Sequence, residues 1–191
     1  MTEKKIPKDV DTTKVQGWIE IEVRDKDGNI KYKLGTPPQK LTKGNPVPIL
    51  TSFPAKELDF YFRKNIITNV GLACMVRLIF AGLTEDKFGY LAIGSGTTSE
   101  SATDTALEYE VARKSASVSQ TTTSITDDTA LLEATFSSAD GLSGSMNISE
   151  TGIFNASSGG DMLARKVFSA VPVDWDAGDT LTIRYYVQMS R

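Results

Sequence analysis

The chain has 191 residues, 40% of them hydrophobic, and a net charge of −3, which suffices for one compact core but gives no positive field to attract nucleic acid or an anionic membrane. It contains no histidine, so Ser-His-Asp catalysis, Cys-His catalysis and His-ligated zinc are excluded. We therefore expect no enzymatic activity and no cofactor, and the single cysteine, Cys74, cannot form a disulfide within the chain.

The first 54 residues are predicted to form a hairpin followed by an extended arm. Residues 1–8 are polar and lack the apolar stretch of a secretory signal. From Gly17 to Leu34, apolar and charged residues alternate on both sides of the turn Asp25-Lys-Asp-Gly-Asn29, a pattern typical of a β-hairpin. This turn resembles the start of a calcium loop but lacks the closing glutamate of such a loop.

The stretch from Gly35 to Pro54 is rich in proline, which neither donates to a strand ladder nor continues a helix. We expect an extended arm that docks on neighbouring subunits, because proline already restricts the free chain and docking then costs less entropy. The interface residues predicted in the arm are Pro37, Pro38, Pro46 and Pro48.

Residues 66–82 are predicted to form a helix that is apolar nearly all round. Thr68 or Asn69 can cap its start, and Gly82 can end it. The polar residues in this stretch argue against a membrane span. We expect a buried helix, covered by its own sheet on one side and by another element or subunit on the other. The predicted contact residues are Leu72, Met75, Ile79 and Phe80.

Residues 55–191 are predicted to form the main domain, an antiparallel β-sandwich or jelly-roll-like fold. Short apolar or alternating runs are separated by turn clusters rich in Gly, Ser and Asp. A helical turn is expected over Thr103–Val111. The predicted strands are Phe88–Ile93, Ala112–Thr121, Thr129–Phe136, Met146–Phe154, Met162–Phe168 and Thr180–Met189.

Two groups of residues are candidate sites. Glu150 lies in an apolar run, where a carboxylate requires a partner; Arg165, Lys166 or Arg184 could supply a structural ion pair, and the alternative is a catalytic acid. Asp174, Trp175 and Asp176 lie in a turn cluster that could stack on a glycan, together with Tyr185 and Tyr186, or bind a cation; the alternative is a solvated turn.

Four stretches in this order resemble structural proteins of tailed bacteriophages. The first two are Asp25–Asn29 and Lys64–Ala73. The third is Tyr90–Thr98, followed by Thr103–Leu107 and Glu110–Arg113. The fourth is Ile148-Ser-Glu-Thr-Gly-Ile-Phe154 with Met162-Leu-Ala-Arg165 and Asp179-Thr-Leu-Thr-Ile183. The resemblance implies a virion component of the neck, collar, tail or baseplate adaptor type, present in several copies. A head decoration protein and a receptor- or glycan-binding tail module are the alternatives.

What the resemblance implies about partners agrees with the residues. The expected partners are further copies of the chain and other virion proteins, with a host surface glycan or receptor as a further partner. We expect neither nucleic acid nor a membrane to be bound. A hydrolase built on Glu150 remains as a third hypothesis, and residues 1–54 with the helix are the expected contacts for assembly.

Overall fold

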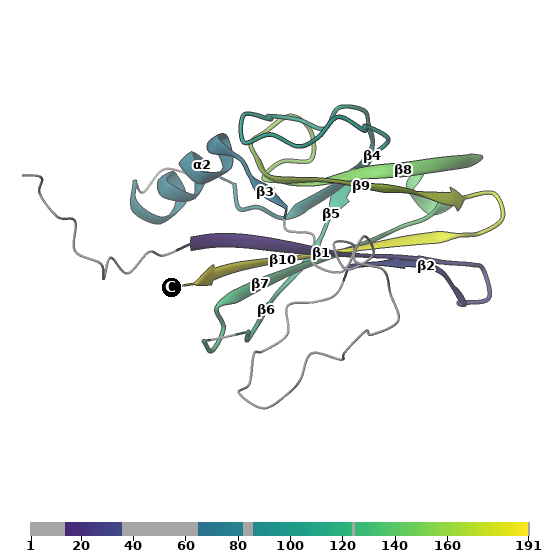
Figure 1. Cartoon of the computed structure of the whole chain (residues 1–191), viewed down its shortest axis with the longest axis horizontal. Helices are drawn as coiled ribbons and strands as arrows, with labels where there is room; N and C mark the ends of the chain where they lie inside the picture. The colour runs from purple at the N-terminus through teal and green to yellow at the C-terminus, as the bar shows by residue number, and fades with distance from the viewer. Residues whose placement is uncertain (1–13, 36–64, 82–85, 124, 191) are drawn as a thin grey trace, which may run out of the picture.

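The computed structural model describes residues 14–35, 65–81, 86–123 and 125–190, which form two antiparallel five-stranded sheets and one α-helix (Figure 1). The first sheet has the order β2-β1-β10-β7-β6, with β1 (Lys14–Arg24), β2 (Ile30–Leu34), β6 (Ser117–Thr121), β7 (Thr129–Phe136) and β10 (Thr180–Ser190). The second has the order β3-β9-β8-β4-β5, with β3 (Ile66–Ile67), β4 (Tyr90–Gly94), β5 (Glu110–Ser115), β8 (Ser145–Phe154) and β9 (Met162–Asp174). The helix is α2 (Asn69–Phe80), and a short 3-10 helix covers Ser138–Asp140. The predicted mainly β, sandwich-like fold is confirmed.

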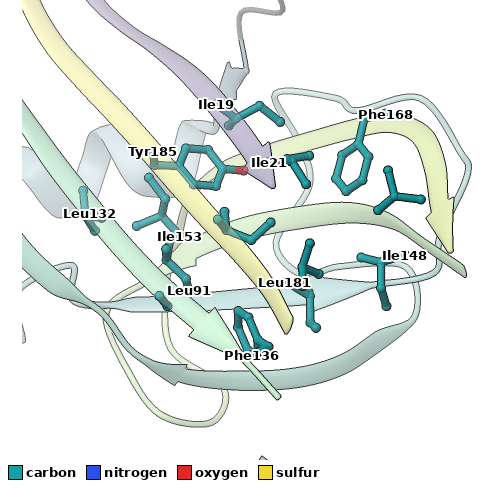
Figure 2. Close-up of a cluster of buried hydrophobic side chains, with 14 of the residues drawn as sticks. Ile19, Ile21, Leu91, Leu132, Phe136, Ile148, Ile153, Phe168, Leu181 and Tyr185 are labelled. Carbon is teal, nitrogen blue, oxygen red and sulfur yellow. The ribbon is translucent and has the colours of Figure 1, made fainter. Parts of the chain in front are cut away.

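The core lies between the two sheets, where every second residue of a strand points inward. On β10 the inward residues Leu181, Ile183 and Tyr185 are fully buried, as the alternation in the sequence predicted. They meet Ile153 and other apolar side chains of the second sheet (Figure 2). The hydroxyl of Tyr185 donates to the Thr151 carbonyl across the sandwich at 2.9 Å, so one polar link joins the sheets inside an otherwise apolar layer.

The predicted N-terminal hairpin is present but belongs to the sandwich. β1 pairs with β2 on one side and, over its whole length, with β10 on the other. The Asp25 carboxylate accepts hydrogen bonds from the backbone N–H groups of Asp27 and Asn29, and Gly28 has a φ of 85°, so this segment is an ordinary hairpin turn. The boundary at residue 54 and the prolines Pro37, Pro38, Pro46 and Pro48 lie outside the described residues.

The helix starts later than predicted. Ile66 and Ile67 pair with β9 as the short strand β3, and Thr68 then caps α2. In the described part of the chain only Gly71 and Cys74 of α2 are buried, so the sheet covers the helix on one side, and the expected cover of the other side by a further element or subunit stays a prediction. One face packs on β9 and the other faces outward (Figure 1).

Two further expectations are corrected between β4 and β7. The helical turn predicted over Thr103–Val111 is replaced by irregular chain that leads into β5. The single strand predicted over Ala112–Thr121 is divided at Ala116, whose N–H donates to the Gly89 carbonyl at 2.8 Å. The chain crosses there from one sheet to the other, because β5 pairs with β4 and β6 pairs with β7.

Candidate functional site

The candidate site is the outward face of α2, and its position is set by the first residues of the helix. Thr68 is fully buried, and its hydroxyl accepts from the Gly71 N–H at 3.0 Å. The same hydroxyl donates to the Met162 carbonyl, and the Thr68 N–H donates to the Leu163 carbonyl at 2.9 Å. One threonine therefore caps the helix and fixes it to β9.

The inward face of α2 lies very close to β9. A Cβ atom at Gly71 would be 2.5 Å from the Leu163 Cα atom, so only glycine permits this approach. Cys74 is fully buried and accepts from the Asn155 side-chain amide at 3.6 Å, and Arg77 forms an ion pair with Asp161. The helix is thus held in place by packing at its start and by charge near its end.

The outward face is apolar and exposed. Four side chains spaced i, i+4, i+7 and i+8 lie on this face, and we call them the α2 patch: Leu72 (42% exposed), Val76 (55%), Ile79 (57%) and Phe80 (79%). The only charged residue of the helix, Arg77, is engaged with Asp161. An apolar helix face without charge is typical of a surface that another protein covers.

Removing the exposed parts of these four side chains from water would stabilise a contact by roughly 4–7 kcal/mol. Association itself costs at least about as much in lost translational and rotational freedom. The α2 patch therefore supports a contact only as one part of a larger interface or in an assembly with several simultaneous contacts.

The sequence-based prediction of this surface was partly right. Leu72, Ile79 and Phe80 belong to the α2 patch, whereas Met75 is half-buried and packs against the main core. Val76 was missed, although its spacing of four residues from both Leu72 and Phe80 is the signal that could have found it.

The predicted glycan-stacking group is not a surface. Trp175 is 1% exposed and belongs to the core, and its backbone N–H donates to the Gly144 carbonyl at 3.0 Å. Tyr185 and Tyr186 are buried as well. Asp174 is half-buried and caps the turn by accepting from the Ala177 N–H, while Asp176 is exposed. Since no aromatic face of this group is open, the turn cannot stack on a sugar.

Glu150 forms the predicted structural ion pair with Arg165. Its fully buried carboxylate accepts from the Arg165 Nε atom at 3.0 Å. It also accepts from three backbone N–H groups of the loop that joins β4 to β5: Gly96 at 3.0 Å, Glu108 at 3.1 Å and Tyr109 at 2.8 Å. A carboxylate so enclosed holds the loop and cannot reach a substrate.

Arg165 connects this buried carboxylate to the surface of the loop. Its guanidinium also donates to Asp104 at 2.8 Å. Burial alone would lower the pKa of Arg165, but its hydrogen bonds to Asp104 and Glu150 outweigh burial and raise that pKa above its usual value. The guanidinium therefore stays charged, as a carboxylate buried beside it requires.

Comparison with protein-family models, with curated proteins and with solved structures finds no match to this chain. The class is therefore defined by the fold and the surface: an antiparallel β-sandwich with one flanking helix and an uncharged helix face. Among the described residues, no helix has the length and apolar character needed to cross a membrane.

Proposed function

We propose that this chain is a structural subunit of a tailed-bacteriophage virion, present in several copies, that serves as a neck, collar, tail or baseplate adaptor through protein–protein contacts. The observation that carries the proposal is the α2 patch, a group of four exposed apolar side chains on a helix whose only charge is paired. A subunit of an assembly needs such a surface, whereas an isolated protein leaves it in water at a cost.

The ordered motifs between residues 17 and 189 support the virion part of the proposal, since they resemble tailed-phage structural proteins. A head decoration protein is the second candidate, favoured by the exposed serine- and threonine-containing strand β6 at the sheet edge. Imaging of particles labelled with a gold-conjugated antibody against the chain distinguishes the two. Label at the neck, tail or baseplate supports an adaptor, label over the head supports decoration, and unlabelled particles contradict both.

The contact itself is tested by replacing Ile79 with serine. Ile79 is 57% exposed, and Ile30 on β2, at 50%, provides a matched control for the same substitution far from the helix. We expect Ile79→Ser to reduce the amount of chain that copurifies with particles, and Ile30→Ser to leave it unchanged. Circular dichroism and thermal unfolding of both variants should match the wild type, because neither side chain fills the core.

Equal incorporation of the Ile79→Ser and wild-type chains would show that the α2 patch is not a contact. Equal loss in both variants would show that the effect is not specific to the helix. Either result removes the support that the α2 patch gives to the proposed function.

A further inference from the structure

The first sheet ends in an open strand. β6 is its outer strand, and among the described strands it pairs with β7 alone. An outer strand presents a row of backbone N–H and C=O groups to which another strand can add, and proteins usually protect such an edge with charges, proline, bulges or very short strands.

The other described edges carry this protection. β2 contains Lys31 and Lys33, and β5 contains Glu110, Arg113 and Lys114. β3 has only two residues. β6 has the sequence Ser-Val-Ser-Gln-Thr, with neither charge nor proline, and residues 117–120 are all exposed. It is therefore the edge best suited to accept a strand.

The exposure of Val118 leaves apolar surface uncovered at this edge. Val118 is opposite Leu132 in the register, and Leu132 points into the core, so Val118 lies on the inner face of the sheet. It is nevertheless 50% exposed. A further strand beside β6 would cover this side chain and supply partners for the backbone edge.

We propose that β6 pairs antiparallel with β6 of a second copy about a two-fold axis at Ser119. The first sheets of the two copies then form one continuous sheet. This inference rests on the proposed multi-copy assembly and assigns it a second contact. The chemistry of the strand favours a second copy as the occupant. Around Ser119, pairing places Ser117 opposite Thr121 and Val118 opposite Gln120 of the other copy, so no like charges meet.

The same operation on β2 shows why the edges differ. Antiparallel self-pairing about Tyr32 would place Lys31 directly opposite Lys33 of the second copy, and like charges in that position are destabilising. A two-fold contact through β6 also lies away from α2. The helix follows β3, and β6 follows β5, which is the outer strand at the opposite edge of the second sheet from β3. One subunit thus has two surfaces with which to extend an assembly.

A charge-swap experiment tests this pairing directly. Ser119→Lys and Ser119→Asp each place two like charges across the axis, so we expect each variant alone to show a dimer dissociation constant raised about fivefold or more. An equal mixture of the two should regain wild-type association, because the heterodimer has opposite charges there. Ser157→Lys, in an exposed loop, is the matched control and should behave as wild type. Sedimentation equilibrium of the full chain provides the measurement.

Three results would overturn the pairing. A wild-type chain that stays monomeric at all concentrations contradicts it, as do Ser119 variants that associate like the wild type, or a mixture that shows no recovery. If Ser119→Lys associates normally while Ile79→Ser reduces copurification with particles, the β6 contact is wrong but the proposed assembly function is retained. If neither Ser119→Lys nor Ile79→Ser has its expected effect, both the β6 pairing and the proposed assembly function are contradicted.

Discussion

The ion pair of Glu150 with Arg165 gives the most quantitative prediction about this fold. Arg165→Met preserves the aliphatic stem and removes the guanidinium, which leaves the Glu150 carboxylate charged, fully buried and without a cation. Removing one partner of a buried pair costs about 3–5 kcal/mol. Three backbone N–H groups continue to stabilise the carboxylate, so we expect the lower end, about 3 kcal/mol.

Urea unfolding followed by tryptophan fluorescence measures this loss. With an m-value of about 2 kcal/mol/M, the midpoint should fall by about 1.5 M. Arg184→Met is the matched control: Arg184 is more exposed and pairs with Glu20 and Glu133, so its loss should cost about 1 kcal/mol or less.

A double variant tests the reasoning behind that number. Glu150→Gln removes the uncompensated charge and retains an acceptor for the loop, so Arg165→Met/Glu150→Gln should be more stable than Arg165→Met alone. A double variant no more stable than Arg165→Met would show that the buried charge is not the source of the loss. Equal losses of free energy in Arg165→Met and Arg184→Met would count against the buried charge as well.

Two further predictions concern the helix contact and acid stability. Gly71→Ala places a Cβ atom 2.5 Å from the Leu163 Cα atom and should lower the free energy of unfolding, measured in a urea titration, by about 1–3 kcal/mol. Gly89→Ala is the control and should have little effect, because the nearest atom to its added Cβ is 3.8 Å away. Equal losses in both variants would contradict the close packing of α2 on β9. Burial raises the pKa of Glu100, but its hydrogen bond to Lys166 outweighs burial and lowers that pKa below its usual value. The pair therefore stabilises the fold at pH values above the unfolded-state pKa of about 4.3. This contribution is lost as pH falls through the lower folded-state pKa. Glu100→Gln should therefore show a weaker loss of stability below about pH 5 than the wild type, and identical acid-unfolding curves would disprove it.

The strands were predictable where one face of a strand meets the core and the other does not. Leu181, Ile183 and Tyr185 alternate with polar residues, and this local pattern is enough to locate β10. Ala112–Thr121 shows the limit of such patterns: the chain looks like one strand, yet pairing with β4 on one side and β7 on the other divides it. Partner strands distant in the sequence decide that division.

The sites show the same dependence on distant contacts. Trp175 between two aspartates looks like an exposed aromatic, but its ring packs in the core, and its backbone N–H donates to the Gly144 carbonyl of a distant turn. Glu150 was predictable as an ion pair because burial of a lone carboxylate is costly. Its three backbone donors were not predictable, since they come from an irregular loop whose path the sequence pattern does not reveal.

We propose that the chain works through surfaces that neighbouring proteins cover, above all the α2 patch. Hydroxyl-radical footprinting of the isolated chain and of the same chain in purified particles tests it most directly. Phe80, the most exposed residue of the patch, should be oxidised in the isolated chain and protected in the particle, while oxidation of Tyr109, exposed on the loop before β5, gives the reference for accessibility. Equal oxidation of Phe80 in both samples would contradict the claim.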